Sequence, residues 1–271
     1  TLRDGEQQAG VTFSKAEKLR IAEKLAELGV HRIEAGTPAV SRDDEAAVRE
    51  IARRRLGPKV FALARCRIED VARAIDCGVD GVVVEIPASE HILEHAYRWP
   101  LERALELSIA ATRFAHEQGA YVVFFPIDST RTGIDWYLTI IEKVAAEGHM
   151  DALALVDTLG VLAPHAVPFM VKAARARIRD KPLEVHFHND FGHAVSNTIL
   201  ALAAGAEVAH VTVSGLGERA GNTPLEDLVV SLLTQYGIDL GLRYEQLYEL
   251  SCLVREFSGH TIPTNRPIVG E

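Results

Sequence analysis

The sequence is poor in cysteine, with only three among 271 residues, at positions 66, 77 and 252. An odd number of widely separated cysteines provides neither a disulfide framework nor a closely spaced metal-binding pair. The start of the chain also lacks the features of a signal peptide. Together these absences predict a protein of the reducing cytoplasm.

Basic charge is also in short supply, because 29 Lys and Arg residues stand against 38 Asp and Glu residues, for a net charge of −9. The two signs are interspersed, so no basic stripe is available to neutralise a nucleic-acid backbone or an anionic membrane. The most apolar long stretch, residues 152–171, contains Asp157 and two prolines and suits a strand, a turn and a helix better than a bilayer span. We therefore expect neither a nucleic acid nor a membrane as partner.

Short β-branched runs alternate along the chain with longer amphipathic stretches of helical spacing. This alternation is typical of repeated βα units around a parallel sheet. We predict a (β/α)8 TIM barrel, with a doubly wound open sheet as the alternative. Strands are predicted at residues 31–36, 60–64, 81–86, 121–126, 152–157, 184–188 and 208–213. Helices are predicted at residues 14–28, 42–54, 69–77, 101–117, 134–146, 166–176, 195–204 and 224–236.

The chain opens on a predicted helix with no strand ahead of it, and it has no initiator methionine, so we expect the first barrel strand to precede Thr1. Residues 242–258 predict one more amphipathic helix, followed by a loop with two prolines. The predicted domains are a barrel over residues 1–240 and the helical start of a C-terminal linker or subdomain over residues 241–271. A C-terminal extension is expected beyond the sequence.

Polar residues gather where the predicted strands end. The loops that follow the strands of such a barrel converge on one face, which carries the chemistry. These residues therefore form one candidate site. They are Arg3, Asp4, Glu6, Gln7, Glu34, Arg65, Glu85, Asp128, Arg131, Asp157, Thr158, His186, His188, Asn189, Asp190, Gly215, Gly217, Glu218, Arg219 and Asn222.

The segment EVHFHND contains two histidines, His186 and His188, which point the same way in an extended strand. Two imidazoles with a carboxylate from another strand can bind a divalent ion and leave positions open for substrate. Asp4 is the natural third ligand, because it directly follows the expected first strand. The alternative is a pair of histidines hydrogen-bonded in the core. Position at a strand end, with Asn189 and Asp190 next to hold the imidazoles, favours the ion.

Two loops are open to more than one interpretation. In SGLGERAGNTP the glycines could form a plain turn capped by Asn222 or Thr223, or Asn222 could offer a carbonyl oxygen to the ion. In VDTLG, Asp157 could cap the next helix, while the hydroxyl of Thr158 could hold a substrate carboxylate. Neither loop decides between these alternatives by itself.

Three stretches together, TLRDGEQQAG, VHFHNDFGHAVSNTILALAAGA and GLGERAGNTPLEDL, carry a family resemblance. They resemble the aldol and Claisen condensing metalloenzymes of the HMG-CoA lyase-like superfamily, which includes isopropylmalate synthase, homocitrate synthase, citramalate synthase and hydroxymethylglutaryl-CoA lyase. The similarity covers essentially the whole chain. It implies that Asp4, His186 and His188 bind a divalent metal ion, Mg²⁺, Mn²⁺ or Zn²⁺, with Asn222 at or near the ion.

The resemblance also implies roles toward substrate. Arg3 corresponds to a catalytic arginine that hydrogen-bonds the substrate carbonyl, and Thr158 to a threonine that binds the carboxylate of a 2-oxo acid. Gln7 is expected to contact substrate, and Glu218 to act in catalysis. The implied reaction adds the enolate of acetyl-CoA to the 2-oxo acid and, after thioester hydrolysis, gives a 2-substituted malate.

Such a 2-alkylmalate synthase is an acyltransferase of amino-acid biosynthesis, and its relatives are commonly homodimers. The lyase has a cysteine in the loop that reads GLGERAGNT here, so the resemblance favours a synthase. One departure keeps other functions open. Phe125 and Ile127 in FFPIDSTR occupy positions that usually carry a hydroxyl and a carboxylate. A metal-dependent carbon–carbon lyase or aldolase, and a non-catalytic oxo-acid-binding homologue, are therefore the alternatives.

Overall fold

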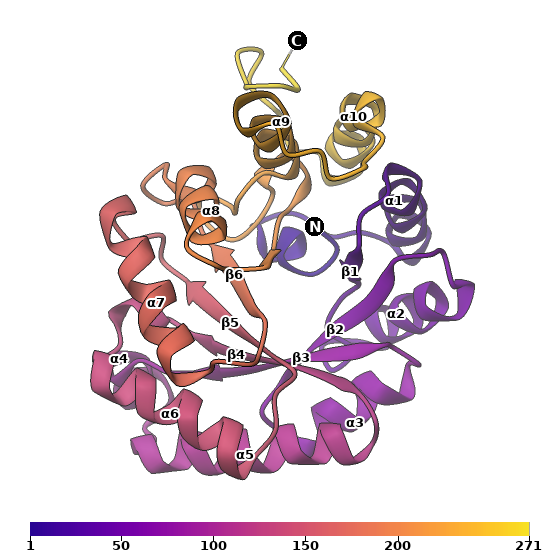
Figure 1. Cartoon of the computed structure of the whole chain (residues 1–271). Coiled ribbons are helices and arrows are strands. Elements are labelled where there is room, and N and C mark those ends of the chain that lie inside the picture. Colours follow the sequence, from indigo (N-terminus) through magenta and orange to yellow (C-terminus); the bar gives the residue numbers. More distant parts are fainter. Residues whose placement is uncertain (271) are drawn as a thin grey trace.

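A parallel sheet of seven strands forms the centre of the protein in this computed structural model, which describes residues 1–270. Each strand pairs with the next in sequence order. Figure 1 shows the sheet curled into an arc with helices on its outer side. The seven predicted strands and the TIM-barrel-like α/β fold are thus confirmed. The strands are β1 (Arg32–Glu34), β2 (Lys59–Arg65), β3 (Gly81–Pro87), β4 (Tyr121–Ile127), β5 (Ala152–Asp157), β6 (Leu183–Phe187) and β7 (Val208–Ala209).

Every predicted helix is present, with bounds that shift by a few residues. They are α1 (Lys15–Leu28), α2 (Arg42–Arg54), α3 (Ile68–Asp76), α5 (Leu101–Glu117), α6 (Ile134–Glu147), α7 (Val167–Arg177), α8 (Ala194–Ala203), α9 (Leu225–Tyr236) and α10 (Leu247–Ser258). The prediction missed elements too short to show a period. They are α4 (Glu90–Ile92), the π-helical turn η2 (Leu93–Tyr97) and the 3-10 turns η1 (Asp4–Gln7), η3 (Ser129–Arg131), η4 (Pro164–Ala166), η5 (Val213–Gly215) and η6 (Tyr244–Gln246).

Alternation along the strands divides the core into two parts. Inward residues such as Val83, Val123 and Ala154 form a small cluster inside the barrel. Outward residues such as Val84 and Val122 belong to a larger cluster between the sheet and the helices. Both faces of the strands are buried, which is why they read as nearly continuous apolar runs.

The sheet is open between β1 and β7, because each of these strands pairs on one side only among residues 1–270. Strand β7 is also shorter than predicted, since regular pairing with β6 ends at Ala209 and the chain then turns toward η5. A strand with one neighbour has few ladder bonds to extend it. The predicted first strand lies ahead of Thr1, outside the described residues, and stays a prediction.

The N-terminal segment is anchored through the buried ammonium of Lys18, which is 2% exposed. Lys18 pairs with Glu6 at 2.6 Å and also with Asp44 of α2. Glu6 in turn accepts a hydrogen bond from the amide of Phe13 at 2.8 Å. A buried charge needs such partners, so these contacts fix η1 against α1 and α2.

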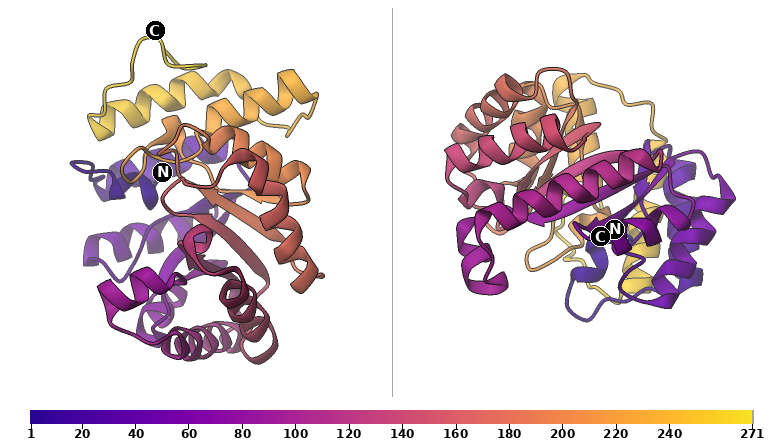
Figure 2. Two further views of the ribbon diagram at one scale, coloured as in Figure 1. Left: turned by 90° about the vertical axis from the view of Figure 1, so that its left-hand side faces the viewer. Right: turned by 90° about the horizontal axis from the view of Figure 1, so that it is seen from below.

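Residues beyond 240 pack against the barrel rather than apart from it. Helix α10 contacts α1, where Lys24 and Glu249 form an ion pair of 2.8 Å. Ser214 of η5 and Ser251 of α10 share a hydrogen bond of 2.7 Å. Figure 2 shows α9 and α10 together on one side of the molecule, near the N-terminus. The predicted domain boundary at residue 240 stays a prediction. Among residues 1–270, no helix is long and apolar enough to cross a membrane.

Candidate metal centre

Three potential metal ligands from opposite ends of the chain meet at the barrel mouth. The Oδ2 atom of Asp4 lies 3.0 Å from Nε2 of His186 and 3.7 Å from Nε2 of His188, and the two Nε2 atoms are 3.3 Å apart. All three residues are buried: Asp4 is 3% exposed, His186 4% and His188 6%. Among residues 1–270 this is the one group of three such ligands within reach of a common ion.

The charge states of this cluster suit a divalent cation. Burial lowers the pKa of His186 to about 4 and lowers that of His188 as well, so both imidazoles are neutral at pH 7. Burial alone would raise the pKa of Asp4, but Arg3 and His186 hold it well below its usual value. Two neutral nitrogens and one carboxylate are the protonation states that metal binding requires.

Asn222 lies beside the cluster and has no hydrogen-bond partner for either side-chain atom among residues 1–270, although it is only 2% exposed. A Cβ atom at Gly217 would lie 2.3 Å from Nδ2 of Asn222 and 3.4 Å from Oδ1 of Asp4, so glycine is needed at this position. A buried amide without a partner is costly. A cation bound by Asp4 would be a partner for the side-chain carbonyl oxygen of Asn222. The residues present therefore fit a metal ion.

Arg3 is oriented beside the cluster by a carboxylate from the next strand. Its Nε donates to Oε1 of Glu34 at 2.8 Å and its Nη2 to Oε2 at 3.3 Å, while Nη1 donates to Oε1 of Gln7 at 2.6 Å. Nη1 also lies 3.5 Å from Oδ2 of Asp4. Two parallel bonds fix the plane of the guanidinium. Gln7 thus contacts Arg3, and sequence pattern alone carried no signal for the Arg3–Glu34 pair.

The loop after β5 places Thr158 near the mouth. Its Oγ1 accepts a hydrogen bond of 2.7 Å from the amide of Asp128, which leaves the hydroxyl proton to donate elsewhere. The neighbouring Asp157 is fully buried and accepts from the amides of Val161 and Leu162 at 3.1 and 3.0 Å. Asp157 therefore fastens the loop after β5, but it does not cap α7, which begins without a side-chain cap, so the expectation of a helix cap was wrong.

Asn189 and Asp190 do not hold the imidazoles, so this expectation was wrong. Asn189 accepts from the amide of Ala194 at the start of α8, at 3.1 Å, and Asp190 pairs with Arg219 at 2.8 Å. These residues fasten the loop and the following helix, because their side chains find partners closer along the surface. The Nδ1 atoms of both imidazoles have no hydrogen-bond partner among residues 1–270.

Glu218 approaches the cluster through its backbone. Its amide lies 3.4 Å from Oδ1 of Asp4, whereas its carboxylate pairs with Arg219 at 3.0 Å and its side chain is 45% exposed. On the opposite side, Phe125 of β4 is buried with its ring centroid 5.1 Å from that of His186. Polar residues of the loop over residues 214–224, which we call the eighth loop, and the apolar end of β4 thus flank the same cluster.

Glu85 of β3 is a further carboxylate of the mouth, aligned with Phe125 in the register of β3 and β4. Among residues 1–270 no hydrogen bond or ion pair engages it. Burial and the nearby carboxylates of Glu34 and Asp4 raise its pKa, and Arg3 opposes this. Its position at a strand end was the sequence signal for it.

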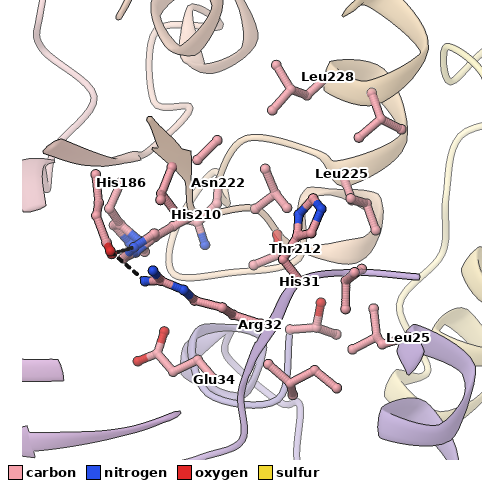
Figure 3. Close-up of a pocket in the computed structure, with 18 of the residues that line it drawn as sticks. Leu25, His31, Arg32, Glu34, His186, His210, Thr212, Asn222, Leu225 and Leu228 are labelled. Atoms are coloured by element: carbon pink, nitrogen blue, oxygen red, sulfur yellow. Dashed lines mark hydrogen bonds and ion pairs between the residues drawn. The ribbon is translucent and has the colours of Figure 1, made fainter. Parts of the chain in front are cut away.

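A cavity of about 430 Å³ opens beside the cluster, on the side between β1 and β7. Asp4, His186 and Asn222 line one part of it, and leucines such as Leu25 and Leu228 line another. Figure 3 shows this apolar wall opposite Arg32, Glu34 and His210. The cavity occupies the gap between β1 and β7, which is where the barrel strand predicted ahead of Thr1 would lie.

The glycine-rich loop that carries Asn222 is anchored by Glu226 of α9. Oε2 of Glu226 accepts from the amide of Ser214 at 3.0 Å, and the residue is 1% exposed. Burial raises the pKa of Glu226 to about 7. Neither Asn222 nor Thr223 caps α9, since the helix starts after Pro224 without a side-chain cap.

Comparison with known proteins gives one consistent family. The sequence profile of the HMGL-like family matches residues 1–254. A probable 2-isopropylmalate synthase of Ignicoccus hospitalis is 44% identical over 271 residues, covering 100% of this chain and 68% of the relative. Homocitrate synthase AksA of Methanocaldococcus jannaschii is 43% identical over 272 residues, covering 100% of this chain and 67% of the relative.

Solved structures agree on the fold. An HMG-CoA lyase of Acinetobacter baumannii, in complex with coenzyme A and 3-methylmalate, superposes with a TM-score of 0.84 at 22% identity. The match covers 97% of this chain and 91% of that chain. Since this identity is low, the likeness concerns the fold.

Replacement of His188 by alanine is expected to abolish binding of one divalent ion per chain while the barrel stays folded, because a ligand at a strand end contributes little to the core. Ion content after dialysis, measured by mass spectrometry, checks this. The exposed His165→Ala is the control. Equal ion content in His188→Ala and the parent would contradict the ligand assignment.

Glu226→Gln is expected to remove a pH dependence of stability. The folded pKa of about 7 lies above the ordinary glutamic acid value of 4.5, so the folded state holds the proton more tightly and stability falls as pH rises between these values. The variant should be more stable than the parent at pH 8, by up to about 3 kcal/mol, with no such gain at pH 4. Denaturant unfolding at both pH values, with exposed Glu117→Gln as control, measures this. An equal parent–variant difference at both values would refute it.

Proposed function

The chain belongs to the HMGL-like family, and from this premise we propose that it is a divalent-metal-dependent 2-alkylmalate synthase. It would condense acetyl-CoA with a 2-oxo acid to give a 2-substituted malate, as an acyltransferase of amino-acid biosynthesis. The relatives named for isopropylmalate and homocitrate synthesis support this reaction type. The coenzyme A in the Acinetobacter baumannii lyase supports a thioester co-substrate.

The observation that carries the proposal is the meeting of Asp4, His186 and His188 in one buried cluster. In our proposal these residues hold Mg²⁺, Mn²⁺ or Zn²⁺, and Asn222 adds its carbonyl oxygen. A bound divalent ion would polarise the keto group of the 2-oxo acid.

The remaining roles belong to groups of the chain itself. Arg3 donates to the substrate carbonyl oxygen, whose negative charge grows during attack, and Glu34 keeps the guanidinium aimed at it. Thr158 donates a hydrogen bond from its hydroxyl group to the substrate carboxylate. Glu218 acts in catalysis from the loop whose backbone approaches Asp4. Gln7 contacts substrate and accepts a hydrogen bond from Arg3.

Cysteine placement supports a synthase rather than a lyase. The eighth loop has no cysteine, and the three that exist lie elsewhere: Cys66 contacts Ser108 of α5, Cys77 follows α3 and Cys252 lies on α10. None of the three cysteines lies in that loop. The lyase chemistry that uses such a thiol would lack its group here.

The test is consumption of acetyl-CoA with a panel of 2-oxo acids, after chelation and after return of Mg²⁺, Mn²⁺ or Zn²⁺. We expect turnover of at least one 2-oxo acid that disappears with the ion and returns with it. No turnover of any pair by the full-length protein would remove the proposal.

The second candidate is a carbon–carbon lyase or aldolase on the same metal site. It is favoured by Phe125 and Ile127, which leave the end of β4 without the hydroxyl and the carboxylate usual in synthases. This candidate predicts release of a 2-oxo acid from a 2-hydroxy or 4-hydroxy precursor with no need for coenzyme A. A non-catalytic homologue would instead bind the 2-oxo acid without chemistry.

The cytoplasmic location and the homodimer are part of the proposal. The unpaired cysteines support the first, and family resemblance supports the second. Light scattering of the purified chain measures the subunit number.

Arg3→Lys is expected to lower turnover about 100-fold or more while ion content stays that of the parent, because an ammonium cannot form both parallel bonds to Glu34 and also face the substrate oxygen. Steady-state kinetics and metal analysis of the same preparation measure both quantities. The control is Arg177→Lys in a surface ion pair with Glu142. Parent-like turnover would exclude the role given to Arg3.

A further inference from the structure

A hydrogen-bonded chain of three side chains lies next to the ligand cluster, toward the amino end of the strands. Arg32 of β1 donates to Oε1 of Glu184 at 2.6 Å, and Oε2 of Glu184 lies 2.7 Å from Nε2 of His210. The dashed lines in Figure 3 mark these two contacts. Glu184 is 1% exposed and precedes His186 by two residues on β6, so both side chains point into the barrel.

Apart from the contacts of its Nε2 atom with Asp4 and His188, the imidazole of His186 is held by neighbouring rings rather than by a hydrogen bond. A metal-binding histidine usually donates its second ring nitrogen to a carboxylate, a carbonyl or water. Here Nδ1 has no protein partner among residues 1–270. Instead the ring makes edge-to-face contacts with two other rings. Its centroid lies 5.1 Å from that of Phe125, with 71° between the ring planes, and 5.5 Å from that of His210, with 78° between the planes.

His210 is itself held on two sides. Its ring is nearly parallel to that of Phe125, with 6.0 Å between the ring centroids and 9° between the ring planes. Its Nε2 contacts Glu184. The far end of the chain is fixed as well, because the guanidinium of Arg32 lies over the rings of Phe61 and Tyr121 at 5.0 and 5.2 Å. Each group can rotate little unless the next one moves.

Stability alone is a weak explanation for this arrangement. An ion pair with a buried carboxylate gains little over apolar side chains of the same size, since Glu184 loses its hydration and Arg32 keeps only part of its own, with 31% of its side chain exposed. The same space inside the barrel is otherwise filled by residues such as Val83 and Val123. The contact with a metal-ligand ring gives the buried carboxylate a second use.

We propose that His210, fixed by Glu184 and Arg32, is a positioning residue that holds the imidazole of His186 in the orientation for binding a divalent ion. This inference rests on the metal centre of the proposed function. In many metal sites a carboxylate accepts a hydrogen bond from the ligand histidine itself. Here Glu184 forms its hydrogen bond with His210, and His210 restrains His186 by ring contact.

The test is Co²⁺ binding to the full chain, followed by calorimetry and by visible absorption, which reports the ligand geometry. His210→Ala should lower the affinity about tenfold to hundredfold and change the absorption bands. His210→Phe keeps the ring but loses Glu184, so a smaller loss of affinity is expected. Glu184→Gln keeps a hydrogen-bonding group, so affinity and bands should stay close to the parent. The control, His149→Ala, removes another histidine paired with a carboxylate, Asp151 at 3.2 Å, away from the mouth.

Parent-like affinity and bands in both His210 variants would overturn the inference, even if their thermal midpoints fall. A loss in Glu184→Gln without a loss in His210→Ala would also overturn it, because charge rather than ring position would then act. If the parent binds Co²⁺ and His188→Ala does not, the metal centre stands whatever the His210 variants do. A parent that binds no Co²⁺ would refute both the metal centre and this inference.

Discussion

Burial of the Asp4 carboxylate against two neutral imidazoles is the interaction around which the mouth of the barrel is built. A carboxylate removed from water needs positive or hydrogen-bonding partners, and here Arg3 is the nearest full positive charge. Arg3 is shared with Glu34, so the group carries more negative than positive charge. A divalent cation bound as proposed would reverse this imbalance.

The N-terminal segment reaches this position through contacts that lie outside the site. Lys18 connects Glu6 to Asp44, and so the turn with Asp4 is tied to two helices, in addition to the bonds of Arg3 with Glu34 of β1. From the other side, the loop after β7 approaches Asp4 closely because Gly217 has no side chain. Ligand geometry thus depends on packing at a distance from the ligands.

The apolar end of β4 gives the centre its particular character. Phe125 contacts the rings of His186 and His210 and lies 5.9 Å from the guanidinium carbon of Arg3. The strand thereby places apolar surface against the ligand cluster. Glu85 on the neighbouring strand is the nearest carboxylate in that part of the register.

The sequence by itself determined the repeating βα units and the shared face of His186 and His188, because both follow from local periodicity. It also predicted that Asp4 would meet these two histidines, and the three side chains do lie together. The tertiary structure alone decided which partners these groups meet. Arg32 and Glu184 are 152 positions apart, and no local pattern encodes their contact. Asn189 and Asp190 likewise found nearer partners than the imidazoles. Such pairings depend on how far the sheet curls, which is a property of all the strands packed together.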